Sequence, residues 1–266
     1  ATIGFAWSCE DWQAQHYARL TEVAAMLPSP LTGAKFRRAV EVAVGQVRTG
    51  LNDNLLVFLP AKAGSGSSTI ALHVAGCLAN ERHGSVLLID ADFRSGLIAE
   101  LLKVSAQYSL VDALQNASSL DGTLWNAITV KADDLEVLAS GRAEKARAFT
   151  WAEYRHLLDF ALARYPSVVA DLPEAADEAT VEVVRRARNV FIVCTAELPS
   201  LLLTRRRQQE LRNSGVPRER VKIILNRWNP RDVTLEDVEQ FLEEPPAAVF
   251  QNDYQAIHGA IVEGRL

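Results

Sequence analysis

The sequence predicts a three-layer α/β fold, in which helices cover both faces of a mostly parallel, twisted sheet. The first observation is a series of continuous apolar runs from about residue 54 onward: LLVFLP, SVLLID, SVVADLP, VFIVCTA and VKIILNR. Unbroken runs of Val, Ile and Leu are typical of strands buried on both faces. The second observation is that segments of helical length separate these runs, as expected for βαβ units.

Each element has an expected place along the chain. The apolar runs predict strands at residues 55–60, 85–90, 167–173, 190–196 and 221–227, and AAVFQ near Ala247 predicts a last strand. The segments between them predict helices over Ser68–Arg82, Thr150–Arg164, Thr180–Arg188 and Pro199–Ser214, and YQAIHGAIVEG predicts a closing helix. Of the 266 residues, 48% are hydrophobic, which is enough for a sizeable core.

The first 49 residues differ from the rest. DWQAQHYARLTEVAAM and AKFRRAVEVAVGQV predict two helices separated by LPSPLTG, and no strong strand precedes them. We interpret residues 1–49 as a helical N-terminal extension, or as the remnant of a receiver-like domain, because LPSP…KFRRAVEVA resembles the last strand, loop and helix of such a domain. Because the chain begins with Ala, we expect it to be a processed or excised piece of a longer protein. Residues 50–266 form the main predicted domain.

The bulk composition limits the classes of function. The net charge of −5 and pI near 5.6 provide no general attraction to nucleic acid or to anionic membranes. The three cysteines (Cys9, Cys77 and Cys194) form no C-x-x-C pair, which argues against a zinc site and favours a reducing cytosol. No apolar run approaches the roughly 18 residues that span a bilayer. We therefore expect a cytoplasmic protein, and interpret the basic stretch Arg205–Arg207 as a solvated helix face.

The strongest functional signal is PAKAGSGSSTIA, residues Pro60–Ala71, between the first strand and the following helix. A strand, a glycine-containing loop and a helix are the context of a phosphate-binding P-loop. Gly64 and Gly66 let backbone N–H groups turn toward phosphate oxygens, and the helix N-terminus adds its own. Ser68 lies where a hydroxyl ligand of Mg²⁺ belongs, with Thr69 beside it. The alternative is that these small residues form only a flexible turn.

The loop departs from the pattern G-x-x-x-x-G-K-[ST] at one position. Ser67 stands where the pattern has the lysine that reaches the β- and γ-phosphates, whereas Lys62 lies near the start of the loop. A charge-assisted hydrogen bond contributes about 1.5–3 kcal/mol, so its loss weakens triphosphate binding by roughly tenfold to a hundredfold. Turnover suffers more, because the same charge stabilises the transferred phosphoryl group. We therefore expect nucleotide binding with weak or absent hydrolysis.

The segment Lys62–Thr69 resembles the deviant Walker A loop of the MinD/ParA ATPases, K-G-G-x-G-K-[ST]-[ST], with Ala63 and Ser67 as its two departures. The resemblance continues from about Asn54 to the end of the chain. VLLIDADFRSG, SVVADLP and IILNRWNP are similar to the family's D-x-D strand, Walker B strand and adenine-side N-R segment. The tail FQNDYQAIHGAIVEGRL resembles the ending of the CpaE/TadZ branch of tight-adherence pilus systems, whose members often lack the second lysine and often carry a receiver-like domain upstream.

Roles for individual residues follow from their types and from the resemblance. Asp171 ends an apolar strand at the carboxyl edge of the sheet, where it can hold Mg²⁺ together with Ser68. The resemblance implies that Asp90 supports the metal shell. By resemblance, Asp92 orients the attacking water, and Lys62 reaches the partner's nucleotide across a dimer interface. The phosphates would be held by Lys62, Gly64, Ser65, Gly66, Ser67, Ser68 and Thr69.

Two asparagines are candidates for the base pocket. Asn226 carries donors and an acceptor suited to an adenine edge, and Asn252 could close the pocket. For these side chains and for the aspartates, a purely structural role is the alternative. Each asparagine could be a turn residue, and Asp90 and Asp92 could be a helix N-cap and a solvated loop carboxylate.

The resemblance implies a protein that binds ATP or ADP with Mg²⁺, forms a homodimer and acts as a localisation and assembly factor for a pilus or secretion system. Its partners would be pilus or secretion proteins, and we do not expect nucleic acid to be a partner. Through those partners the protein would lie at a cell pole or at the membrane. Two alternatives are an active ParA/MinD-type ATPase in positioning or partitioning, and a nucleotide-free scaffold. Sustained phosphate release would favour the first alternative, and failure to bind nucleotide would favour the second.

Overall fold

The computed structural model describes residues 3–6, 25–28, 52–81, 85–141, 149–175, 178–253 and 257–259. The chain divides into two compact units, Ala1–Asn52 and Asp53–Leu266. In the first unit, β1 (Ile3–Ala6) pairs in parallel with β2 (Ala25–Pro28). The sequence did not predict β1, and Ala25 and Met26, which end the first predicted helix, belong to β2. The helices predicted there lie almost entirely outside the described residues, and the receiver-like origin and the boundary at residue 50 stay predictions.

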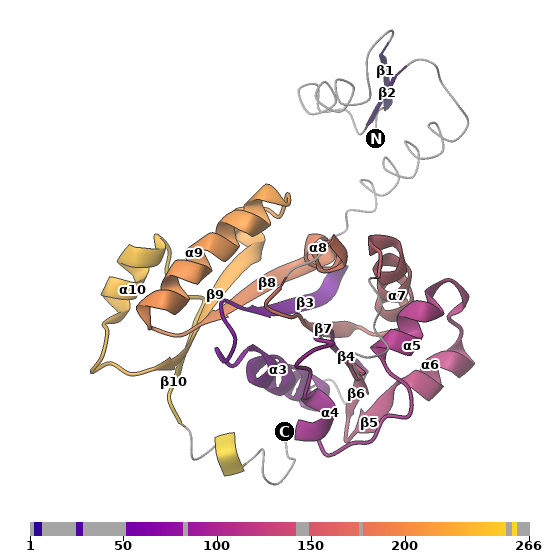
Figure 1. The fold of residues 1–266 in the computed structure, drawn as a ribbon, viewed down its shortest axis with the longest axis horizontal. Helices are drawn as coiled ribbons and strands as arrows, with labels where there is room; N and C mark the ends of the chain where they lie inside the picture. Colours follow the sequence, from indigo (N-terminus) through magenta and orange to yellow (C-terminus); the bar gives the residue numbers. More distant parts are fainter. Residues whose placement is uncertain are drawn as a thin grey trace. The chain divides into compact units, whose positions relative to one another are not determined.

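The second unit is built on one sheet, whose described strands lie in the order β10-β9-β8-β3-β7-β4-β6-β5 (Figure 1). The pairs β3–β7, β7–β4, β4–β6, β8–β9 and β9–β10 are parallel, whereas the edge strand β5 runs antiparallel to β6. The strands are β3 (Asn52–Pro60), β4 (Val86–Asp90), β5 (Val130–Ala132), β6 (Leu135–Leu138), β7 (Ser167–Asp171), β8 (Ala187–Cys194), β9 (Val221–Trp228) and β10 (Ala248–Gln251).

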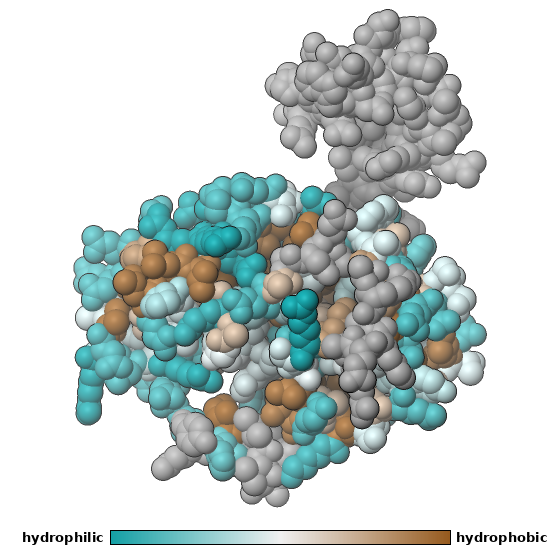
Figure 2. Space-filling view, viewed as in Figure 1, coloured by the Kyte–Doolittle hydropathy of each residue, from teal (hydrophilic) through white to brown (hydrophobic). Residues whose placement is uncertain are grey.

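Helices cover both faces of this sheet, so the predicted fold class is confirmed. Buried side chains of α3 (Ser67–Glu81) and α4 (Ile98–Leu101) pack on one face. The other face is covered by α5 (Leu110–Gln115), α6 (Gly122–Ile128), α7 (Trp151–Arg164), α8 (Glu178–Arg186), α9 (Leu198–Asn213) and α10 (Leu235–Leu242). On the surface over α9 and α10, hydrophobic side chains lie beside hydrophilic ones (Figure 2).

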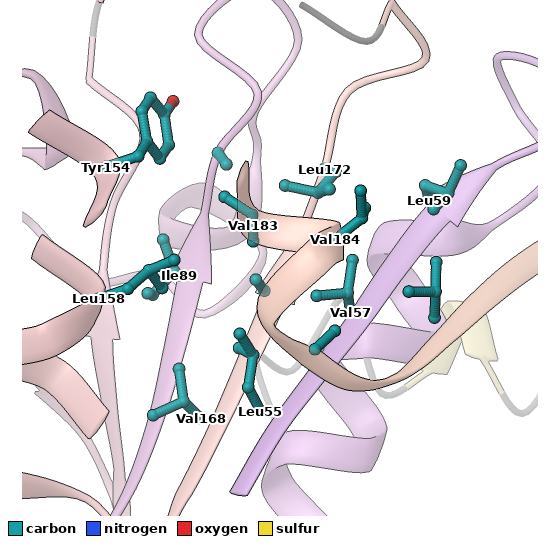
Figure 3. Packing of buried hydrophobic residues seen from close by; sticks show 14 of the residues in the cluster. Leu55, Val57, Leu59, Ile89, Tyr154, Leu158, Val168, Leu172, Val183 and Val184 are labelled. Carbon is teal, nitrogen blue, oxygen red and sulfur yellow. The ribbon is translucent and has the colours of Figure 1, made fainter. Parts of the chain in front are cut away.

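The core explains why the strands are continuous apolar runs. Along β3, Leu55, Val57 and Leu59 enter the cluster beneath α5–α10, whereas Phe58 enters the cluster beneath α3. Figure 3 shows the first cluster, in which side chains of β3, β7 and α8 meet. Burying an aliphatic or aromatic side chain of this size contributes about 1.5–3 kcal/mol. Because successive residues face opposite layers, no position of a central strand can be polar without cost.

The predicted strands and long helices lie within a few residues of their observed bounds. Short elements between residues 98 and 138, together with α10, were not predicted from the sequence. Of the predicted closing helix, residues 257–259 are helical, and the rest lies outside the described part of the chain. Thr150 illustrates a local start signal, since its N–H donates to Glu153 Oε2 at 2.7 Å in the capping box of α7.

Candidate functional site: a phosphate-loop cavity at the carboxyl edge of the sheet

The glycine loop joins β3 to α3 and is fixed at both ends. The N–H of Ala61 donates to the carbonyl of Val193 in β8 (2.9 Å), and the N–H of Ile70 donates to the carbonyl of Gly66 (3.0 Å) as α3 begins. Gly64 and Gly66 have φ values of +80° and +91°, in the left-handed region that favours glycine. The turn expected of a phosphate-binding loop is therefore present.

Asn226, at the end of β9, braces this loop. Its Nδ2 donates to the carbonyl of Ser65 at 2.8 Å, and a β-carbon on Gly66 would lie 2.3 Å from the same nitrogen. Position 66 therefore accepts only glycine while Asn226 holds this place. This contact gives Asn226 a supporting role at the loop, and its predicted role at the adenine stays a prediction.

The start of α3 meets the predicted metal-binding carboxylate. Ser67 Oγ donates to Asp171 Oδ1 at 3.2 Å, and the Ser68 hydroxyl also bonds to Asp171. Asp90 lies beside Asp171 on the neighbouring strand, in direct register. Both carboxyl groups are almost fully buried, with 2% of Asp171 and 1% of Asp90 exposed. The sheet thus brings together Ser68, Asp90 and Asp171, the three residues predicted to hold Mg²⁺.

Burial dominates the electrostatics of the two carboxyl groups. It raises the pKa of Asp171 to about 7, against the lowering effect of the Ser68 and Ser67 hydroxyls. It raises the pKa of Asp90 to about 6, although backbone N–H groups of Ile98 and Asp92 lower it. Carboxylate oxygens are hard donors that suit a divalent cation, and a bound cation would favour the ionised forms of both groups. Among the described residues no three His, Cys, Asp or Glu side chains converge on one point, so water and phosphate would complete the coordination.

Asp90 and Asp92 also hold the loop after β4. Asp90 Oδ2 accepts the N–H of Ile98, the first residue of α4, at 3.2 Å. Asp92 Oδ1 accepts the N–H groups of Arg94 and Ser95, each at 2.9 Å. The alternative structural roles of these aspartates, a contact at a helix start and a loop carboxylate, are therefore present in the geometry. Asp92 nevertheless lines the cavity, so its predicted role toward water stays a prediction.

Lys62 turns away from the loop. Its Nζ lies 2.6 Å from Glu197 Oε2, just before α9, and the Lys62 and Glu197 side chains are 32% and 61% exposed. An exposed pair of this kind contributes about 0–1 kcal/mol, so the lysine can change partners. The next residue, Ala63, donates its N–H to Glu174 Oε2 at 2.9 Å. Carboxylates of two other segments therefore contact the first residues of the loop.

A cavity of about 770 Å³ opens over the loop. Its lining includes Gly64, Ser65, Gly66, Ser67, Ser68 and Thr69. The volume falls within the usual range for small-molecule sites. Ser65 Oγ is buried and has no hydrogen-bond partner among the described residues, so a polar ligand could satisfy it. The cavity and the donors around it therefore fit the phosphates of a nucleotide.

Of the predicted site residues, five do not line this cavity: Lys62, Asp90, Asp171, Asn226 and Asn252. Asn252 donates its backbone N–H to the carbonyl of Trp228 at 3.2 Å, as in a turn. Arg206 and Arg207 line the cavity, whereas Arg205 pairs with Glu243 at 2.7 Å. The stretch interpreted as a solvated face thus reaches the site in part. Sequence reasoning also missed Arg94, Glu174, Glu210 and Arg227 as lining residues, since only the fold brings their segments together.

Within the described residues, no helix is long and apolar enough to cross a membrane.

Comparison with known proteins gives one sequence relative and several similar folds. No model of a known protein family matches the chain. Its sequence is 24% identical over 182 residues to the septum site-determining protein MinD of Thermotoga maritima. The aligned residues cover 68% of this chain and 66% of that protein. The chain therefore spans just under two thirds of the length of this relative.

Three solved structures share the fold. A ParA family ATPase from Chlorobium tepidum has a TM-score of 0.74 and 24% identity, covering 80% of this chain and 90% of that one. MinD of Pyrococcus horikoshii, complexed with Mg-ADP, has a TM-score of 0.66, 19% identity and coverages of 80% and 86%. The MinC:MinD complex of Aquifex aeolicus gives a TM-score of 0.66 at 18% identity, with coverages of 80% and 86%. The chain is thus similar to MinD in sequence and has the fold of the MinD/ParA P-loop ATPases.

Proposed function

We propose that this chain, with its MinD/ParA-type fold, binds ATP or ADP with Mg²⁺ and acts as a nucleotide-dependent positioning or partitioning factor. The observation that carries the proposal is the cavity over the glycine loop. The loop residues, including Ser68, line this cavity, and Ser68 is hydrogen-bonded to Asp171. The MinD structure complexed with Mg-ADP supports the choice of ligand. MinD and ParA relatives favour positioning or partitioning over other uses of the fold.

The residues divide the work of holding the nucleotide. The backbone N–H groups of Gly64 and Gly66 and those at the N-terminus of α3 would bind phosphate oxygens. Ser68, Asp171 and Asp90 would hold Mg²⁺, which neutralises phosphate charge when bound. Asn226 would keep the loop in its turn and reach the adenine edge, with Asn252 beside the base. Asp92 would orient water in any hydrolysis, and Lys62 would act across a dimer interface.

Hydrolysis is proposed to be weak or absent. Ser67 supplies a neutral hydroxyl where the P-loop pattern has a lysine, and this hydroxyl is engaged with Asp171. The developing charge of the transferred phosphoryl group would then lack one fixed cation. The competing hypothesis is an active ATPase, in which other cations of the cavity serve that purpose. Steady phosphate release separates the two. Release that disappears in Asp92→Ala would establish the active ATPase, and background release in the wild type would support binding without turnover.

The pilus-assembly role stays a second candidate. It is supported by Ser67 at the second lysine position and by the tail FQNDYQAIHGAIVEGRL, which resembles the CpaE/TadZ branch. In that case the partners would be pilus or secretion proteins, and the protein would lie in the cytoplasm, held at a pole or membrane through them. The MinC:MinD complex supports the more general proposal of a nucleotide-dependent protein partner. Deleting the gene and scoring both pilus display and septum placement would separate the two candidates.

A nucleotide-free scaffold is the third candidate, favoured by the contact of the Glu174 carboxylate with the loop N–H of Ala63. A carboxylate at this position competes with phosphate for a backbone donor. Absence of any binding by ATP or ADP at millimolar concentration would establish the scaffold.

A further inference from the structure

The phosphate cavity has an unusual source of positive charge. Position 67 carries serine, and the loop lysine Lys62 pairs with Glu197 and does not line the cavity. Among the described residues, every basic side chain in the lining is an arginine from outside the loop, namely Arg94, Arg206, Arg207 and Arg227. A bound triphosphate carries several negative charges, which need cations or donors near them.

Two of these arginines are already engaged. Arg207 Nη1 lies 2.9 Å from Glu210 Oε2, and its other Nη donates to the carbonyl of Glu174. Arg206 Nε lies 3.1 Å from Glu210 Oε1. The single negative charge of Glu210 therefore offsets one of the two positive charges of Arg206 and Arg207. Through its bond to the Glu174 carbonyl, Arg207 also holds the segment after β7. These contacts make α9 a support of the cavity wall.

The guanidinium groups of Arg94 and Arg227 are in a different state. Both residues are exposed and line the cavity, and within the described part of the chain neither guanidinium has an ion pair or hydrogen bond. They come from separate segments, the loop after β4 and the end of β9, so they reach the cavity independently. Their charges are available to a bound anion.

Hydrogen bonds fix the backbone around both residues. The N–H of Arg94 is fixed by Asp92 Oδ1 at 2.9 Å. Arg227 follows Asn226, whose amide is bonded to the Ser65 carbonyl at 2.8 Å, and its own φ is +54°. A non-glycine residue in this left-handed region costs on the order of 1 kcal/mol and persists where the surrounding structure fixes it. Strain of this kind beside a cavity is typical of functional positions.

We propose that Arg94 and Arg227 supply the positive charge to nucleotide phosphates that the phosphate loop itself lacks at Ser67. The inference rests on the proposed nucleotide binding. It assigns two phosphate-contacting residues outside the loop and explains how a P-loop without its lysine retains affinity for a polyanion. Arg227 would contact the ligand from the side of Asn226, and Arg94 from the side of Asp92.

The test is calorimetric titration of the full chain with MgATP and MgADP, using Arg94→Ala, Arg227→Ala and the double variant. We expect each single change to weaken ATP binding about tenfold and the double change about a hundredfold, with smaller losses for ADP. Arg231→Ala is the matched control, because Arg231 is an exposed arginine four residues beyond Arg227 that lies outside the cavity lining. Arg94→Lys and Arg227→Lys should recover most of the affinity, since they restore the charge.

Two further readings separate a phosphate contact from a structural effect. Raising the salt concentration should weaken ATP binding less in the double variant than in the wild type, because two charge contacts are gone. Thermal melting should be unchanged in all variants. The inference would be overturned if both single alanine variants kept wild-type ATP affinity. It would also be overturned if they lost ATP and ADP affinity equally and to the same extent as the Arg231→Ala control. A wild-type chain that binds no MgATP would instead contradict the proposed function, and the inference with it.

Discussion

At the scale of single residues, the site depends on two buried carboxyl groups, those of Asp171 and Asp90. Asp171 and Asp90 have pKa values of about 7 and about 6, raised by burial from an ordinary value of 3.8. The hydroxyls of Ser67 and Ser68 stabilise the ionised Asp171 only in part. A lysine at position 67 would place a charge beside this carboxylate, whereas serine leaves its ionisation costly. Burial therefore favours the protonated form of both carboxyl groups.

These raised pKa values predict a pH dependence of stability. The folded chain binds protons on Asp171 and Asp90 more tightly than the unfolded chain, so it holds more protons between about pH 4 and pH 7. The stabilisation is complete below the unfolded pKa of 3.8 and is lost as the pH rises through the folded values of about 6 and 7. Each group contributes a slope of up to about 1.4 kcal/mol per pH unit.

Asp171→Asn tests this contribution, because asparagine keeps the shape and stays neutral. Without nucleotide, we expect the variant to be more stable than the wild type at pH 8 and similar to it at pH 4, as measured by urea unfolding at a series of pH values. Mg²⁺-dependent ATP binding should be lost in the same variant. A constant stability difference across this pH range would show that folding does not raise the pKa of Asp171, and undiminished Mg²⁺ dependence would show that another group holds the metal.

At the scale of elements, the sheet order explains why the site forms where it does. β3 lies between β8 and β7, so the segments after these three strands meet at one edge. This placement brings Lys62 to Glu197 and Ala63 to Glu174, residues more than 100 positions apart. β9 is one strand further along and delivers Asn226 to the loop. The phosphate loop is thus held by contacts from three separate elements.

The bracing of the loop by β9 can be tested through Asn226→Ala. If support of the loop is the main role of this side chain, the variant loses the hydrogen bond to Ser65 and should bind ATP and GTP more weakly by the same factor, about tenfold. Titrating both nucleotides measures this. A loss for ATP that clearly exceeds the loss for GTP would instead assign Asn226 to adenine recognition, as the sequence resemblance implies.

How far the sequence predicts these elements depends on their length and burial. Central strands such as β4 and β7 are buried at every residue, so their apolar runs identify them without any structure. By contrast, α4 has four residues and β5 has three, which is too short for a hydrophobic period to be recognised. The glycine loop was predicted because its motif is local in sequence.

The rest of the site could not be predicted in this way. Arg94, Glu174 and Arg227 reach the cavity only through the order of the strands, and no spacing in the sequence connects them. The pairing of Lys62 with Glu197 is equally invisible, since it depends on the position of the segment before α9. Side-chain partners across a parallel sheet are a property of the fold, whereas motif residues within one loop are a property of the sequence.

At the scale of the whole molecule, the proposed function depends on a second copy of the chain. Lys62 is held by an exposed ion pair that costs little to break, so it can leave Glu197 for a partner's nucleotide. We expect Lys62→Ala to weaken ATP-dependent dimerisation by at least tenfold while leaving nucleotide affinity of the monomer nearly unchanged. Analytical ultracentrifugation with MgATP, paired with calorimetry at low protein concentration, separates the two effects.

Glu197→Gln is the control for the lysine, because it removes the competing carboxylate and leaves Lys62 in place. Dimerisation should be unchanged or stronger in this variant. Equal losses of dimerisation and monomer affinity in Lys62→Ala would show instead that the lysine acts within its own subunit.

The most direct test of the account is whether the cavity over the glycine loop binds nucleotide. Calorimetric titration with MgATP should be made on the wild type, Gly66→Ala and Gly215→Ala. The last is a matched control, since Gly215 has a similar φ of +86° and open space around it, whereas a β-carbon at Gly66 would collide with Asn226. We predict micromolar binding by the wild type and the control, and its loss in Gly66→Ala. No binding by the folded wild type, or equal binding by all three, would contradict the account.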